Sequence, residues 1–177
     1  STQSAPHVFV VYAISMISVF AAGYFPAYFM EKKKLDPYRG RMRAMLLFAF
    51  FPLLILLAQP LGGYSVWLPV IIIGIAAAAH QSWSANIFTT VSDMFPKHAV
   101  GTITGIGGMA GGVGSFFINK SSGVLFDHAA NTNLKFLGYE GIESGYFIIF
   151  IFCAVAYLLG WTIMKALVPK YQLITDM

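Results

Sequence analysis

The stretch SVWLPVIIIGIAAAAHQSWSANIFT, residues 65–89, contains no Asp, Glu, Lys or Arg. A helix needs about 20 mainly apolar residues to cross a bilayer, so this stretch is expected to be a spanning helix. Its second half nevertheless carries a polar run, His80-Gln81-Ser82-Trp83-Ser84-Ala85-Asn86. Polar side chains at that depth are unfavourable unless they face protein or a water-filled cavity.

Four more charge-free stretches have spanning length, at about residues 8–30, 44–61, 99–119 and 144–164. A turn signal, Pro60-Leu61-Gly62-Gly63, separates the second span from the third. Of all 177 residues 58% are hydrophobic and only 10% are charged, against roughly a quarter charged in soluble domains. The sequence therefore predicts an all-α membrane protein with five spans, surrounded by lipid.

The distribution of Lys and Arg predicts the orientation. Nine of the 11 basic residues fall in the loop 31–43, at position 97 or near the carboxyl terminus. Short cytoplasmic loops are rich in Lys and Arg, so the amino terminus is expected outside and the carboxyl terminus in the cytoplasm. The net charge of +4 does not indicate nucleic acid, because the basic loop lacks interleaved aromatic residues for base stacking.

Five spans is an odd number for a transporter, since such folds are usually built from paired repeats. The chain also begins with Ser1 rather than Met. Both observations lead us to expect that a segment is missing at the front and that the chain is the end of a longer polypeptide.

The span at 99–119 carries glycines at spacings of four and three residues, which places them on one helical face: Gly101, Gly105, Gly108 and Gly112. Such a face lets another helix approach closely, either as a sliding surface or as static packing. The match to a dinucleotide fingerprint at Gly105-x-Gly107-x-x-Ala110 has no strand before it, so no cofactor is expected.

The polar run supplies the candidate binding residues His80, Gln81, Ser84 and Asn86. The run lies near the bilayer midplane, where secondary transporters bind their substrates. Gln81 and Ser84 share a helical face, whereas Asn86 points elsewhere. The alternative is that these side chains only form hydrogen bonds between helices.

The basic loop supplies candidate gating residues, Asp36, Arg39, Arg41 and Arg43, as an acid and three arginines able to form a breakable charge network. Asp93 either joins this network or caps a helix end. Alternatively, the loop charges only set the topology. No nucleophile and base occur in a recognisable arrangement, and the histidines lack metal-ligand spacing, so neither an enzyme nor a metal site is expected.

Residues 80–96, HQSWSANIFTTVSDMFP, with Ala99-Val100-Gly101 and 105–112, GIGGMAGG, resemble the anion:cation symporter family of the major facilitator superfamily. Within it the chain looks most like bacterial hexuronate transporters. The resemblance implies the last five helices of a twelve-helix fold. It also implies proton-coupled uptake of a sugar acid, such as glucuronate or galacturonate, by alternating access across the bacterial inner membrane.

The same resemblance implies substrate contacts from Gln81, Ser84 and Asn86. It also implies that the amino-terminal half of the same polypeptide is missing here, and that this half is the partner of the chain and carries most carboxylate- and proton-binding residues. It also makes the loop from Asp36 to Arg43 similar to a degenerate cytoplasmic gating motif. A different class of function stays open, a membrane scaffold or partner subunit without transport. Polar residues gathered at the midplane favour the transporter, because a scaffold has no need of them.

Overall fold

The computed structural model describes residues 4–174, so Ser1 and the other two residues before Ser4 lie outside the described part. Five helical segments in it are long and apolar enough to cross a membrane, in agreement with the predicted all-α membrane protein. They comprise α1 Ala5–Met16 with α2 Ser18–Lys33, α3 Pro37–Phe50 with the 3-10 helix η1 Phe51–Leu57 and α4 Ala58–Gly62, α5 Trp67–Met94, α6 Lys97–Thr132 and α7 Ile142–Leu167.

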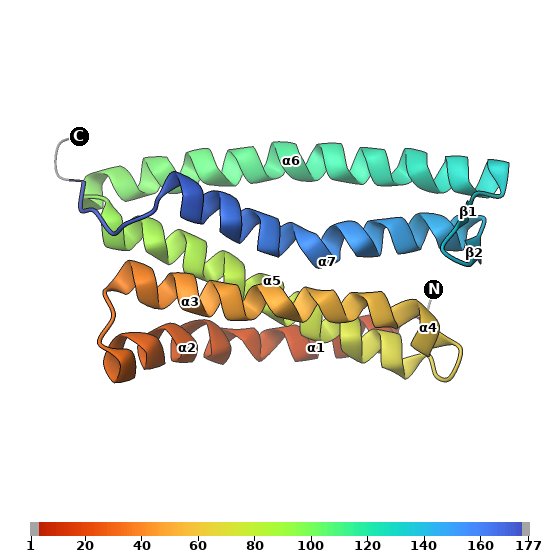
Figure 1. Ribbon diagram of the computed structural model, residues 1–177, viewed down its shortest axis with the longest axis horizontal. Helices are drawn as coiled ribbons and strands as arrows, with labels where there is room; N and C mark the ends of the chain where they lie inside the picture. Colours follow the sequence, from red (N-terminus) through yellow and green to blue (C-terminus); the bar gives the residue numbers. More distant parts are fainter. Residues whose placement is uncertain (1–3, 175–177) are drawn as a thin grey trace.

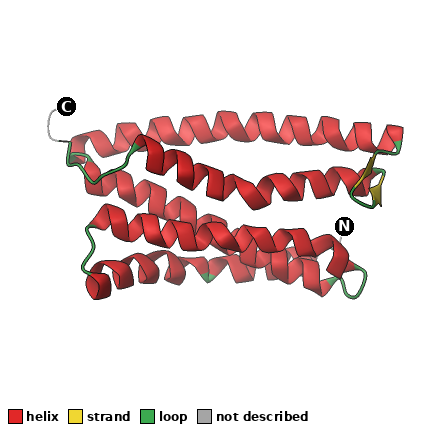
Figure 2. Cartoon of the chain, viewed as in Figure 1, coloured by secondary structure: helices red, strands yellow, loops and turns green. Residues whose placement is uncertain are grey.

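The helices run along one common direction (Figure 1, Figure 2). Helices α6 and α7 lie along one edge, α2 and α3 along the opposite edge, and α5 crosses obliquely between them. The α2–α3 loop, the α5–α6 junction and the carboxyl-terminal segment meet at one end of the bundle. This end carries most of the basic residues, and we call it the basic end.

The start of α3 follows from its sequence. The Asp36 carboxylate accepts a hydrogen bond of 2.9 Å from the Arg39 backbone N–H, and Pro37 occupies the first turn. An aspartate at the N-cap accepts a hydrogen bond from a backbone N–H that has no partner within the helix. A proline in the first turn costs no hydrogen bond, because an N–H at that position would have no helical acceptor. These two residues fix where the chain turns back into the membrane.

The predicted turn at Pro60–Gly63 was wrong in its position. Helix α4 continues to Gly62, and the turn falls at residues 63–66. A proline in a helix cannot donate to the carbonyl four residues earlier, here that of Leu56. That carbonyl belongs to the 3-10 stretch Phe51–Leu57, where bonds join residues three apart, so Pro60 does not interrupt the helix.

The fourth span is longer than predicted. Helix α6 has 36 residues and ends at Thr132, so Lys120 and Asp127 lie within it. Its length of roughly 54 Å exceeds the bilayer core of about 30 Å, which lets its outer turns carry charge in water. A short hairpin, β1 Lys135–Phe136 and β2 Tyr139–Glu140, then leads into α7.

Helix α6 is also the least covered element. Before Ala129 none of its residues is buried, whereas α3 alone buries seven. The core therefore lies among α2, α3, α5 and α7, and α6 contributes one flank beside α7.

The orientation is open to a labelling test. In a Cys153→Ala background, a cysteine at Asn131 is expected to react with an impermeant thiol reagent added outside intact cells. A cysteine at Arg39, which has an exposed side chain, is expected to stay unlabelled because the distribution of Lys and Arg predicts that the basic end lies in the cytoplasm. The reverse pattern would overturn the orientation.

Candidate functional site

The polar run lies at the middle of α5. Gln81 follows Trp67 by 14 residues and precedes Met94 by 13, because the helix covers 67–94. At about 1.5 Å per residue, Gln81 is roughly 20 Å from either end. Its depth corresponds to the bilayer midplane when α5 spans the membrane.

Two faces of α5 divide the polar side chains. His80 and Gln81 are exposed and Ser84 is half-buried, whereas Ser82 and Asn86 are each only 1% exposed. Gln81 has no hydrogen-bond partner within residues 4–174. The four predicted binding residues are therefore not brought together on one surface. Gln81 and Ser84 lie on the side of α5 that faces away from the bundle interior, and we call them the outward-facing pair.

Asn86 has a defined interior role that follows from a proline. Pro26 lies inside α2 and has no N–H, so the carbonyl of Ala22, four residues earlier, loses its helical donor. The Asn86 side-chain amide donates to that carbonyl at 3.1 Å, and also to the Ser82 carbonyl at 2.8 Å. This contact compensates the proline and favours a structural role for Asn86 over substrate binding.

A second contact joins the same two helices one turn away. The Ser82 hydroxyl donates to the Ser18 carbonyl at 3.2 Å, and Asn86 donates to that of Ala22. The donors on α5 and the acceptors on α2 are both four residues apart. This spacing holds one face of α5 against one face of α2.

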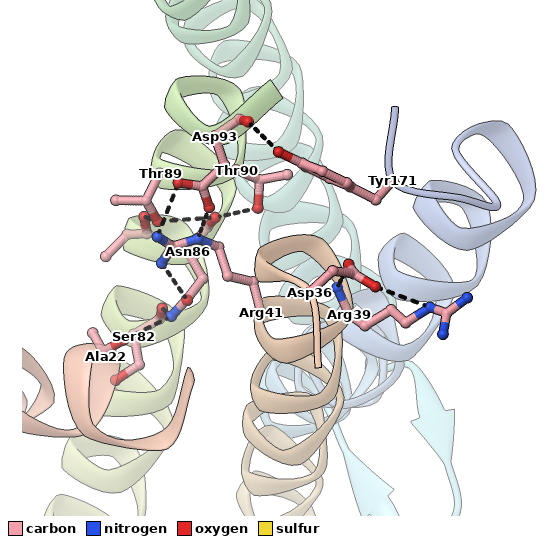
Figure 3. A network of polar contacts seen from close by, with 11 residues as sticks. Ala22, Asp36, Arg39, Arg41, Ser82, Asn86, Thr89, Thr90, Asp93 and Tyr171 are labelled. Atoms are coloured by element: carbon pink, nitrogen blue, oxygen red, sulfur yellow. Dashed lines mark hydrogen bonds and ion pairs between the residues drawn. The ribbon is translucent and has the colours of Figure 1, made fainter. Parts of the chain in front are cut away.

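An ion pair continues this network toward the basic end (Figure 3). Arg41 Nε lies 2.5 Å from Asp93 Oδ2, and the two side chains are 17% and 23% exposed. Arg41 Nη1 also reaches Asn86 Oδ1 at 3.5 Å. Asp93 thus pairs with one member of the predicted charge network, Arg41, and links the start of α3 to the end of α5.

The other gating candidates lie outside this pair. Asp36 and Arg39 form a local ion pair of 3.1 Å three residues apart, with 63% of the Arg39 side chain exposed. Arg43 is exposed and forms no ion pair with any residue from 4 to 174. Of the four candidates only Arg41 reaches another spanning helix, so a gating role for the set stays a prediction.

His80 meets a residue that the sequence did not single out. Its Nδ1 lies 2.5 Å from the Tyr157 hydroxyl on α7, and the Trp83 ring packs edge-on against Tyr157 at 5.4 Å between centroids. A tyrosine hydroxyl within the charge-free stretch 144–164 was the available signal, because it also needs a partner there. His80 therefore links α5 to α7.

The glycine face of α6 contacts nothing in the rest of the described chain. A Cβ built on Gly101, Gly105, Gly108 or Gly112 meets nothing within 4 Å among residues 4–174. By contrast, one on Gly145 of α7 would lie 3.0 Å from the Phe126 ring. Helix α6 thus packs on α7 through its outer turns, and the predicted close packing needs a helix from beyond these residues.

No family model, curated protein or solved structure matches this chain. Its own residues establish a largely helical chain with five segments suited to a membrane.

Proposed function

We propose that this chain is the carboxyl-terminal part of a proton-coupled symporter of the major facilitator superfamily. It would take up a sugar acid, such as glucuronate or galacturonate, by alternating access across the bacterial inner membrane. The observation that carries the proposal is the outward-facing pair of Gln81 and Ser84 at the middle of α5.

An unpaired amide in hydrocarbon is energetically unfavourable. Gln81 is exposed and has no partner in the part of the chain described, so lipid would surround a group with two donors and an acceptor. A polar cavity between two halves of a transporter removes that cost. The opposite wall of this cavity would come from the missing amino-terminal half.

The chemistry of the pair fits part of a sugar acid. A neutral amide and a hydroxyl form hydrogen bonds with sugar hydroxyls, whereas a carboxylate is better met by a cation. No Lys or Arg lies within residues 67–94, the whole of α5. We therefore assign the binding of the substrate carboxylate and of the proton to residues of the missing half. His80 lies near the outward-facing pair and is held there by Tyr157.

The test is sugar-acid binding by the purified full-length polypeptide. Gln81→Ala is expected to weaken binding about 5- to 150-fold, because losing one hydrogen bond leaves a buried group unpaired at a cost of roughly 1–3 kcal/mol. Membrane expression should stay normal, since the Gln81 side chain is exposed and has no hydrogen-bond partner within residues 4–174.

Asn86→Ala is the matched control, because it removes an amide from the interior face of the same helix. It should lower the yield of folded protein while leaving the affinity of that protein unchanged. If Gln81→Ala and Ser84→Ala both bind with full affinity, the pair is not part of the binding site. Failure of the unmodified protein to bind any sugar acid would favour the scaffold alternative.

A further inference from the structure

The segment after α7 folds back across the ends of two other helices. We call residues 168–174 the carboxyl-terminal strap. Tyr38 of α3 donates its hydroxyl to the Val168 carbonyl, the Tyr171 hydroxyl donates to the Asp93 carbonyl at 3.2 Å, and the Ile174 N–H donates to the Met94 carbonyl at 2.9 Å. The strap thus connects α7 with the start of α3 and the end of α5.

The strap supplies what the end of α5 lacks. The last four carbonyls of a helix have no helical donor. A glycine just beyond the helix often lets the next backbone N–H groups donate to these carbonyls. Here Phe95 precedes Pro96 and is extended, with φ −113° and ψ 151°. The chain therefore leaves α5 without a glycine cap of this kind. Only the Val91 carbonyl receives a local donor, from the Phe95 N–H.

Two of the remaining three carbonyls, those of Asp93 and Met94, receive their donors from the strap. The cap of α5 therefore comes from residues about 80 positions later in the chain. Asp93 is held twice, through its side chain by Arg41 and through its carbonyl by Tyr171.

A pocket of about 420 Å³ lies under the strap. Strap residues from Val168 to Ile174 form one wall, and Tyr38, Thr90 and Met94 are part of the other. Tyr38 and Met94 belong to a buried apolar cluster against which Val168 and Tyr171 pack. If the strap left, water would gain access to this cluster and to the two carbonyls.

We propose that the carboxyl-terminal strap is a releasable clasp, which caps α5 and closes the basic end of the bundle over this pocket. Release is accessible because water can replace the strap as donor to the Asp93 and Met94 carbonyls, so each bond contributes only a modest net stabilisation. The inference does not depend on transport and concerns the chain as it stands.

The experiment measures how fast a cysteine in the pocket reacts. Thr90 lines the pocket and is 4% exposed, so Thr90→Cys in a Cys153→Ala background should react slowly with a polar maleimide in detergent micelles. Its labelling rate reports the fraction of time for which the strap is open. Tyr171→Phe is expected to accelerate labelling about 2- to 12-fold, as the loss of one hydrogen bond predicts.

Removal of residues 171–177 takes away two of the bonds and is expected to accelerate labelling about 5- to 150-fold. Tyr64→Phe is the matched control, because Tyr64 is 85% exposed at the opposite end of the bundle, and it should leave the rate unchanged. A second reporter is Ala154→Cys. Ala154 is 0% exposed and lies in a separate buried apolar cluster, so a cysteine there should stay unreactive in every variant.

Two results would overturn the clasp. Equal Thr90→Cys labelling with and without residues 171–177 would show that the strap does not close the pocket. Parallel acceleration at Ala154→Cys would show general unfolding in place of strap release. Neither outcome bears on sugar-acid binding, so the clasp and the proposed function fail separately.

Discussion

Replacing Arg41 with alanine is expected to lower the free energy of unfolding by about 3 kcal/mol, because it leaves the partly buried Asp93 carboxylate without its partner. The pair has side-chain exposures of only 17% and 23%, so water cannot fully replace the guanidinium. The loss also removes the contact of Arg41 with the Asn86 side chain. This one substitution therefore weakens the contact between α3 and α5 and also the contact between α5 and α2.

Unfolding of the purified chain in micelles, followed by tryptophan fluorescence during denaturant titration, measures this effect. Arg39→Ala is the matched control from the same helix turn, since its ion pair is local and 63% of the side chain is exposed. It should change the unfolding free energy by less than about 1 kcal/mol. Adding Asp93→Ala to Arg41→Ala should cost less than the sum of the two single changes. Equal small losses for Arg41 and Arg39 would show that the Arg41–Asp93 pair contributes nothing to stability.

Gly108→Leu is expected to change the stability of this chain by less than about 1 kcal/mol and yet to abolish most uptake by the proposed full-length transporter. In the chain itself a Cβ at Gly108 meets nothing within 4 Å of described atoms. In the full-length protein the glycine face is proposed to lie against a helix of the missing part, and a leucine would force the two apart. Uptake is expected to fall about 5- to 150-fold, because overpacking at a helix contact costs roughly 1–3 kcal/mol.

Gly145→Leu gives the opposite result and serves as the matched control. Its Cβ would lie 3.0 Å from the Phe126 ring and 3.3 Å from the Ala129 Cβ, so the α6–α7 seam must widen. Overpacking of this kind costs roughly 1–3 kcal/mol, and the isolated chain should already show the loss. Normal uptake with Gly108→Leu at normal expression would mean that the glycine face meets lipid.

The helices were predictable because hydrocarbon imposes a simple requirement on sequence. Charge-free stretches long enough to cross the bilayer marked all five segments, and helical spacing correctly separated Gln81 and Ser84 from Asn86. The turn after Pro60 was misplaced because a 3-10 segment relieved the constraint that proline normally imposes. The end of α6 was misplaced because a helix that leaves the bilayer core tolerates charge.

The partners within the network were less predictable. Asp93 and Arg41 lie 52 residues apart and Asn86 and Ala22 lie 64 apart, and spacing along one helix says nothing of such contacts. One signal was present, since a proline inside a spanning helix leaves a carbonyl in need of a donor from another helix. The strap offered no signal of this kind, because backbone groups of any sequence can cap a helix end.

The contacts of Ser82 and Asn86 with α2 have a mechanical consequence. Two hydrogen bonds a helical turn apart oppose both sliding and axial rotation of α5 against α2, so the two helices are expected to move together as one rigid beam. Asp93 lies 12 residues beyond Gln81 on this beam, or roughly 18 Å along it. A tilt of about 10° pivoting at Asp93 would therefore swing Gln81 by roughly 3 Å, the length of one hydrogen bond. The beam would thereby act as a lever from the basic end to the middle of α5.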